Sequence, residues 1–129
     1  LVAGTGNKVE DFGVGFYTKY GDGGVDLSPI ADLMKTEVFG LAKHLGIVKS
    51  IIDAPPTDGL WDDDRNDEDQ LGAKYEELEW AMRCVNDGQT HSLSTRQKEV
   101  LYIYNNFHRA NKHKMEPIPV CEIPKSIKR

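Results

Sequence analysis

The stretch from Gly4 to Asp26 constrains this chain most, because seven of its residues are glycine. Glycine at this density is costly in a helix or strand, and it belongs where the backbone takes a positive φ or approaches a ligand closely. The residues between the glycines supply a hydroxyl, carboxylates and an ammonium group, which contact phosphates, metal ions and polar substrates: Thr5, Glu10, Lys19, Asp22 and Asp26. Turns use the same residues, so the spacing leaves a glycine-rich connection and a binding loop both open.

The rest of the composition is that of one globular domain. The chain has 129 residues, of which 39% are hydrophobic and 29% charged, enough for one hydrophobic core. Its net charge of −5 argues against a general nucleic-acid or anionic-membrane surface. Cys84 and Cys121 lie far apart and have no zinc-ligand spacing, so we expect free thiols. With no apolar run of bilayer length, we expect a cytoplasmic protein.

Apolar residues at three- and four-residue spacing predict three main helices, over about residues 32–45, 74–87 and 94–112. Gly46 and Gly88 are typical helix stops, and Ser94 with Gln97 resembles a capping box. A short helical turn is expected over residues 47–52. The apolar stripe of the first helix consists of Ile30, Met34, Val38, Leu41, Ala42 and Leu45.

Extended structure is expected at three places. Residues 25–29 read as a strand, and Leu1–Ala3 reads as a strand that needs a partner, so we expect the N-terminus to be a cut. The tail from Glu116 carries three prolines and can at best be an edge strand. Residues 58–69 hold seven acidic side chains against one arginine, which favours a flexible acidic loop over residues 58–72.

Basic side chains cluster at the end of the last predicted helix: His108, Arg109, Lys112, His113 and Lys114. Cations favour a helix C-terminus through the backbone dipole, and the same groups bind phosphate or carboxylate, so both interpretations stay open. No serine or cysteine has the setting of a nucleophile. The groups together point to a site for a phosphate ester.

The residues assembled so far resemble the ammonia-dependent NAD synthetases of the ATP-pyrophosphatase group. Gly4–Glu10 looks like the family's GTxxxxE element, and Phe16–Asp26 is similar to its FFTKYGDGGxD signature. The likeness continues in order through Pro29–Lys35, Pro56–Thr57, Asp67–Gly72, Tyr75–Glu77 and His113–Lys114. The family's SGGxDS phosphate loop does not occur in the chain. The resemblance therefore implies that residues 1–129 are the C-terminal portion of a single synthetase domain.

For the fold, the resemblance implies a Rossmann-like α/β architecture of the adenine nucleotide alpha-hydrolase type in the parent protein. This portion is expected to be mainly helical, with one or two short strands. Members of the family convert deamido-NAD, ammonia and ATP to NAD, AMP and pyrophosphate through an acyl-adenylate, with Mg²⁺ and as homodimers. No protein nucleophile is needed, so we expect no catalytic residue here and an inactive isolated chain. The alternatives are a non-catalytic nucleotide-binding or dimerisation module, or the synthetase part of a glutamine-dependent enzyme.

The resemblance also implies site residues, position by position. The residues that would contact ATP are Thr5, Lys35 and Thr57. The residues that would contact deamido-NAD are Lys19, Asp26, His113 and Lys114. Glu10 would hold the magnesium ion, a hard cation that takes oxygen ligands. Between Glu10 and Lys19 this chain has one residue more than several family sequences, so Asp11 could take the metal role instead. Asp22 is expected to be a turn residue.

Overall fold

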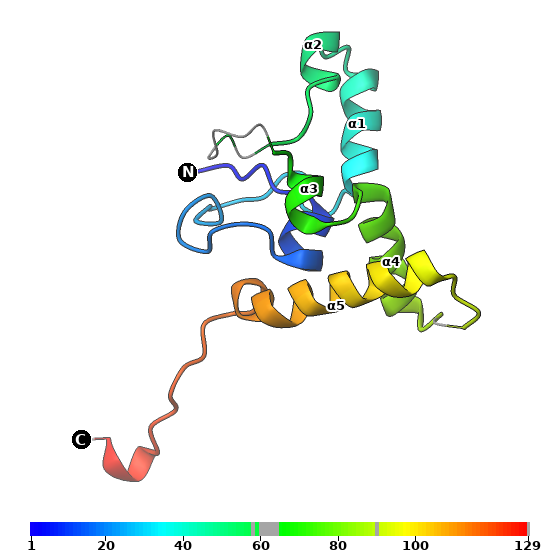
Figure 1. Ribbon diagram of the computed structural model, residues 1–129. Coiled ribbons are helices and arrows are strands. Elements are labelled where there is room, and N and C mark those ends of the chain that lie inside the picture. Colours follow the sequence, from blue (N-terminus) through cyan, green and yellow to red (C-terminus); the bar gives the residue numbers. More distant parts are fainter. Residues whose placement is uncertain (58, 60–64, 90, 129) are drawn as a thin grey trace.

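The computed structural model describes residues 1–57, 59, 65–89 and 91–128 (Figure 1). In chain order the elements are the π-helix η1 (Val9–Val14), α1 (Lys35–His44), α2 (Lys49–Ile52), α3 (Asp67–Leu71), α4 (Tyr75–Asp87), α5 (Thr95–Met115) and the 3-10 helix η2 (Lys125–Ile127). Helices α1, α4 and α5 are the three predicted main helices. No helix in these ranges is long and apolar enough to cross a membrane.

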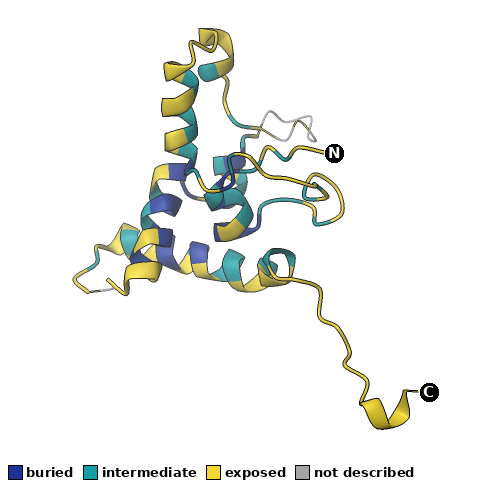
Figure 2. Ribbon diagram, turned by 180° about the vertical axis from the view of Figure 1, so that it is seen from behind, coloured by how far each residue is buried: buried dark blue, intermediate teal, exposed yellow. Residues whose placement is uncertain are grey.

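The core lies where α4, α5 and η1 meet. Leu78 of α4, Val100 of α5 and both Val9 and Val14 of η1 are almost completely buried. Figure 2 shows the buried residues gathered at this junction, with the rest of the molecule mostly exposed. The apolar residues of α4 recur at helical spacing and so form one face. This face packs against both η1 and α5. The core therefore fixes η1, the first helix of the glycine-rich stretch, against two longer helices.

The predicted helix caps are confirmed. Ser94 Oγ accepts a hydrogen bond from Gln97 N at 3.2 Å, and Gln97 Oε1 accepts one from Ser94 N at 2.9 Å. Gly46 and Gly88 take the left-handed conformation, with φ of 70° and 68°. Helix α5 runs three residues past its predicted end, to Met115. Cys84 and Cys121 are free thiols, as expected.

Helix α1 projects from the core (Figure 1) and buries none of its residues. Leu41 and Leu45, on its predicted apolar stripe, are 39% and 65% exposed. The helix begins at Lys35, three residues later than predicted, because turns occupy the preceding segment, where Leu33 N donates to Ile30 O. Among the described residues, the apolar stripe is thus covered at Met34 and half-covered at Val38 and Ala42, and it is exposed toward its C-terminal end.

The prediction of one or two short strands is wrong for the described residues. Ala3 and Leu27 form a single parallel bridge, flanked by bonds from Gly4 N to Leu27 O at 2.7 Å and from Asp26 N to Val2 O at 2.9 Å. The predicted segments at residues 1–3 and 25–29 do pair, but Pro29 and the turn before Val25 confine the pairing to one position. No third segment among the described residues extends it into a sheet. The extended tail pairs with nothing described, and Figure 2 shows it exposed along its length.

The acidic segment contains a helix that sequence analysis did not anticipate. Asn66 caps α3 by accepting a hydrogen bond from Asp69 N at 2.9 Å, and Gly72 ends it. Asp67 and Leu71 of this helix are buried. The predicted loop over residues 58–72 is therefore helical at its end, whereas residues 58 and 60–64 lie outside the described part of the chain.

Candidate functional site

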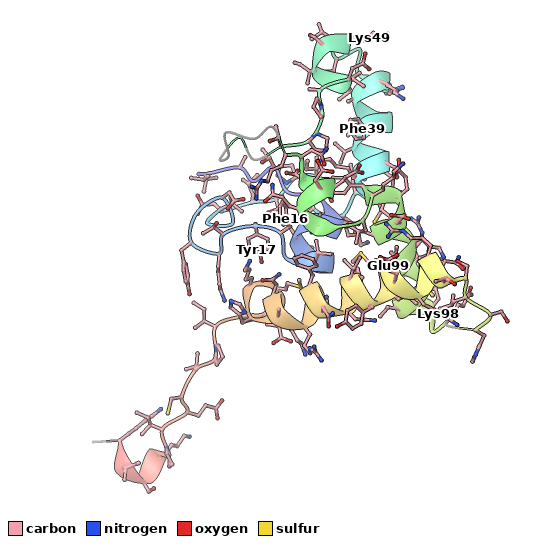
Figure 3. All side chains as sticks on the ribbon, viewed as in Figure 1. Phe16, Tyr17, Phe39, Lys49, Lys98 and Glu99 are labelled. Atoms are coloured by element: carbon pink, nitrogen blue, oxygen red, sulfur yellow. The ribbon has the colours of Figure 1, made fainter. Side chains whose placement is uncertain are left out.

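The glycine-rich stretch walls a cavity of about 270 Å³. Its lining comes from the Gly4–Gly6 loop, η1 and the two residues Phe16 and Tyr17 after it, the segment from Asp22 to Ser28, and the C-terminal end of α5. Its polar lining includes Thr5, Glu10, Asp11, Tyr17, Asp22 and Lys114. Phe16 and Tyr17, labelled in Figure 3, follow η1 in the glycine-rich stretch, and the carbonyl of Tyr17 accepts a hydrogen bond from Lys114 at the end of α5. Residues almost a hundred positions apart in sequence thus share one cavity.

The π-helix η1 places two consecutive carboxylates, Glu10 and Asp11, in this wall. Its start is held by Asn7, which is 2% exposed and whose Oδ1 accepts hydrogen bonds from Val9 N and Glu10 N at 3.1 and 3.2 Å. A π-helix carries more residues per turn than an α-helix and often marks a functional site.

Two glycines of this stretch permit close approach of other side chains of the chain. A Cβ atom added at Gly6 would lie 2.0 Å from Asp11 Oδ1, inside any allowed contact. Gly15, which ends η1, has a φ of 64° and packs against α5, where an added Cβ would lie 2.5 Å from Asn111 Cβ. Gly15 excludes a side chain because Asn111 Cβ cannot move without α5, whereas a side chain at Gly6 would force the Asp11 carboxylate to turn away from its place in the cavity wall.

Glu10 is the centre of a partly buried network. Its Oε1 accepts hydrogen bonds from Lys35 Nζ at 2.9 Å and from Tyr75 Oη at 2.6 Å. The side chains of Lys35 and Glu10 are only 20% and 14% exposed, and Lys35 Nζ also lies 4.7 Å from the centre of the Tyr75 ring. The structure therefore brings together the residue predicted to hold the metal and one of those predicted to contact ATP.

The predicted ATP residues do not all share one cavity. Thr5 lines the first cavity, whereas Lys35 and Pro56 line a second one, of about 230 Å³. Thr57 follows Pro56, is exposed, and accepts a hydrogen bond from Gly59 N at 3.1 Å. Glu10 links the two regions, because it lines the first cavity and bonds to Lys35.

Three of the four residues predicted to contact deamido-NAD lie together. Lys19 Nζ donates to the carbonyl of His113, and Lys114 Nζ donates to Gly15 O at 2.9 Å and to Tyr17 O at 2.7 Å. Burial lowers the pKa of Lys114, against the opposing effect of Asp22. Asp26 is apart from them: its Oδ2 accepts a hydrogen bond from Val2 N at 2.7 Å and does not line the cavity.

Three carboxylates line the cavity and repel one another: Glu10, Asp11 and Asp22. Burial, then Glu10, then Asp22 raise the pKa of Asp11 from 3.8 to about 6. Asp22 has the turn role that was predicted, since its Oδ1 accepts a hydrogen bond from Thr18 N at 2.8 Å, and it also lines the cavity. A cation, or a cationic group of a ligand, would relieve the repulsion between these carboxylates.

Two buried residues of α4 that sequence analysis missed support this site. Tyr75 was named only within the family likeness over Tyr75–Glu77, with no role in the site, yet its hydroxyl bonds to Glu10. Glu79 is 1% exposed, and its carboxylate accepts hydrogen bonds from Thr36 N at 2.9 Å and Thr36 Oγ1 at 2.8 Å. The available signal was Glu79 itself, because a carboxylate on an otherwise buried helix face needs a polar partner.

A glycine-rich cavity with adjacent carboxylates and lysines suits a phosphorylated ligand with its cation, and comparison with known proteins specifies the class. The family model described as NAD synthase matches residues 1–118, and the chain belongs to this family.

The NH(3)-dependent NAD(+) synthetase of Archaeoglobus fulgidus is 42% identical over 123 residues, which are 95% of this chain and 47% of that protein. The enzyme of the same name from Syntrophomonas wolfei is 39% identical over 128 residues, 99% of this chain and 47% of that protein. The chain thus spans about half the length of the curated relatives it matches.

Among solved structures, the NMN synthetase of Francisella tularensis superposes with a TM-score of 0.77 at 33% identity, covering 94% of this chain and 46% of that one. The NH3-dependent NAD synthetase of Campylobacter jejuni, solved with a nitrate ion, superposes with a TM-score of 0.65 at 22% identity, covering 93% and 44%. The second likeness concerns the fold alone. Both place these helices in the architecture of the family.

Proposed function

We propose that this chain supplies part of the site of a ligase that amidates deamido-NAD with ammonia and ATP, giving NAD, AMP and pyrophosphate. The observation that carries the proposal is the position of Glu10, which lines a cavity with Thr5 and Lys114 and bonds directly to Lys35. One carboxylate thereby joins residues that the family resemblance assigns to the two nucleotide substrates. The names of the curated relatives support the same reaction.

The reaction proceeds in two displacements. An oxygen of the pyridine carboxylate attacks the α-phosphorus of ATP, and the bond to the bridging oxygen breaks to release pyrophosphate. Ammonia then attacks the carbonyl carbon of the acyl-adenylate, the bond to AMP breaks, and the nitrogen loses a proton to the medium. No protein nucleophile takes part, so the contribution of the chain is to orient the substrates and to balance phosphate charge.

The lysines suit this task because their hydrogen bonds are incompletely used. An ammonium group has three donors. Lys114 donates two hydrogen bonds to the carbonyls of Gly15 and Tyr17, which leaves one N–H for a ligand oxygen. Lys19 donates one to His113 and keeps two. Both ammonium groups are thus held by the backbone while a donor remains for a carboxylate or phosphate.

The residues present fit a magnesium ion. Glu10 and Asp11 are adjacent hard oxygen donors in one wall, and Mg²⁺ in nucleotide sites usually takes one or two carboxylates together with phosphate oxygens and water. Oε1 of Glu10 accepts hydrogen bonds from Lys35 and Tyr75, whereas the one bond to Oε2 from the described residues is a long one, of 3.4 Å from Asn7 N. When bound, the ion would neutralise charge on the phosphates. Glu10 through Oε2 and Asp11 would hold it.

The test is an assay with ATP, Mg²⁺, ammonia and deamido-NAD, on this chain alone and together with the half of the relatives that it does not cover. We expect NAD and AMP to form in equal amounts only in the combined protein. Lys35→Ala is expected to abolish product, whereas Lys43→Ala, on the exposed side of the same helix, leaves the rate unchanged. Absence of both NAD and AMP under conditions where a known synthetase works overturns the proposal.

One observation favours a second candidate substrate. The solved structure with a TM-score of 0.77 to this chain is an NMN synthetase. The same two displacements on nicotinate mononucleotide would yield NMN, and the cavity residues would act in the same roles. Running the assay in parallel with deamido-NAD and nicotinate mononucleotide decides between them, because the preferred substrate has the higher kcat/KM.

Assembly as a homodimer accompanies the proposal. The exposed end of the apolar stripe, at Leu41 and Leu45, supports a protein partner for α1. Sedimentation of the combined protein at several concentrations tests the oligomeric state. A monomer at every concentration would remove dimerisation from the proposal and leave the reaction untouched.

A further inference from the structure

The Glu10–Lys35 pair depends on two long, flexible side chains meeting across the fold. Lysine has four rotatable bonds and loses about 2 kcal/mol of rotamer entropy when it is fixed. The pair therefore needs support if both groups are to stay in place before a nucleotide arrives. The described residues around it provide that support from a single helix, α4.

Tyr75, at the start of α4, contacts both members of the pair. It is 3% exposed, its hydroxyl lies 2.6 Å from Glu10 Oε1, and its ring centre lies 4.7 Å from Lys35 Nζ. A phenol has one hydrogen, and the other carboxylate within reach, Asp67 Oδ2, is at 3.2 Å. Because the hydroxyl can donate to only one carboxylate at a time, the shorter distance assigns the hydrogen to Glu10.

The consequence for Glu10 is a fixed orientation. Oε1 receives a charge-assisted bond from Lys35 and a second one from Tyr75, so it is saturated by the protein. Rotation of the carboxylate would break both bonds. Oε2, which has only the long contact to Asn7, is thereby kept as the oxygen available to a ligand.

The second support lies one helical turn further along α4. Glu79, four residues after Tyr75 and so on the same side of the helix, accepts hydrogen bonds from the backbone and side chain of Thr36. Thr36 follows Lys35 in the first turn of α1. Helix α4 therefore fixes the backbone from which Lys35 extends as well as the ammonium group at its end.

We propose that Tyr75 is a positioning residue for nucleotide binding, whose hydroxyl orients the Glu10 carboxylate and whose ring holds the Lys35 ammonium. The inference rests on the proposed function, since it assigns Tyr75 to the same site. Tyr75 touches no reacting atom and acts through Glu10 and Lys35. The family likeness includes Tyr75 within Tyr75–Glu77, but it gives this residue no role, and helical spacing alone places it among the apolar positions of α4.

The sharpest variant is Tyr75→Phe, which removes the hydroxyl and keeps the ring and its packing. The matched control is Tyr104→Phe, because Tyr104 is also 3% exposed but its hydroxyl makes no hydrogen bond to a described residue. The protein combines this chain with the half of the relatives that it does not cover, and the probe is ATP with Mg²⁺. Loss of an outer partner of a metal or phosphate ligand costs about tenfold in affinity or more.

We expect calorimetry to show that the Kd of Mg·ATP rises about tenfold in Tyr75→Phe and stays within about twofold in Tyr104→Phe. In the assay, KM for Mg·ATP should rise while kcat at saturation changes little. If Tyr75→Phe does not fold, a variant with fluorotyrosine at position 75 is used instead. Its hydroxyl remains, so its affinity for Mg·ATP should equal that of wild type. Equal Kd values for wild type and Tyr75→Phe overturn the inference. Failure of the wild type to bind Mg·ATP would instead overturn the proposed function.

Discussion

Lys35 Nζ lies 2.9 Å from Glu10 Oε1, although 25 residues separate the two in sequence. Their side chains are 20% and 14% exposed, so the pair is largely shielded from water and salt. The net contribution of a shielded ion pair to stability is small. Removing one partner costs more than that contribution, because the remaining charge stays partly buried and unpaired. The stability of this region should therefore respond asymmetrically to single and double substitutions.

Lys35→Met is expected to lower the free energy of unfolding by about 2 kcal/mol, since it leaves the Glu10 carboxylate without its cation. Adding Glu10→Gln to that variant should restore part of the loss. Urea denaturation of the four combinations measures the coupling. Lys43→Met on the exposed side of α1 is the control, expected to lie within about 0.5 kcal/mol of wild type. Equal effects of Lys35→Met and Lys43→Met would contradict the prediction.

Gly15→Ala is expected to destabilise the chain much more than Gly46→Ala. Both glycines have a positive φ, of 64° and 70°, so alanine costs about 1 kcal/mol at either. At Gly15 the added Cβ would also lie 2.5 Å from Asn111 Cβ on α5, whereas at Gly46 nothing lies within 4 Å. We expect a total of about 3 kcal/mol at Gly15, because η1 must move away from α5. Denaturant midpoints of the two variants give the comparison.

The parts of the fold that sequence could predict are those fixed by local chemistry. Helices α4 and α5 follow from apolar spacing, and their ends follow from Gly88 and from the Ser94–Gln97 capping box. The strand prediction was wrong because strand pairing depends on tertiary contacts. The segments predicted at residues 1–3 and 25–29 contain the two bridge residues, Ala3 and Leu27, but Asp26 bends and Pro29 lies in a turn, and the extent of pairing depends on neighbours that no local pattern encodes.

The candidate site was predictable only in part, for a related reason. The family motif named Thr5, Glu10 and Lys114, which the structure places in one cavity. Tyr75 and Glu79 fill ordinary positions on a buried helix face, and their partners Glu10 and Thr36 lie more than forty residues away. The π-helix was equally hidden, since it differs from an α-helix by one residue in hydrogen-bond spacing and carries no composition of its own.

Asp11 should make stability fall as pH rises through mild acidity. Its folded pKa of about 6 lies above the usual 3.8, so between these values the folded chain holds a proton that the unfolded chain has lost. The cost is absent below about pH 3.8 and complete above about pH 6. Asp11→Asn should therefore stabilise the chain at pH 8 by about 1 kcal/mol, a value reduced for the solvent exposure of the group. It should have no effect near pH 3.

Asp32 should change stability with pH in the direction opposite to Asp11. A hydrogen bond from Lys8 and its charge lower the pKa of Asp32, so this carboxylate contributes stability above its unfolded pKa and loses it as pH falls. Asp32→Asn should therefore weaken the chain at pH 8 and match wild type at low pH. Unfolding midpoints of both variants across the pH range check the two signs. A stabilising effect of Asp11→Asn that persists unchanged near pH 3 would argue against titration as its cause.

Glu79→Ala is expected to loosen the start of α1 selectively. The substitution removes the buried acceptor of Thr36 N and Thr36 Oγ1, and because Thr36 itself is exposed, water replaces part of the loss, so we expect a cost of about 1 kcal/mol. Amide hydrogen exchange at Thr36 should accelerate by at least the factor that the global destabilisation predicts. Glu79→Gln keeps one acceptor oxygen for the Thr36 amide and should lose about half as much.

Glu76→Ala is the control for this prediction, because Glu76 lies in the first turn of the same helix but is exposed. Its effect should stay within about 0.5 kcal/mol. If Glu79→Ala slowed or left unchanged the exchange at Thr36, the carboxylate could not be what anchors α1. Because Lys35 precedes Thr36, that result would also remove the support that α4 gives to the lysine backbone, leaving only the ring and hydroxyl of Tyr75 to hold the pair.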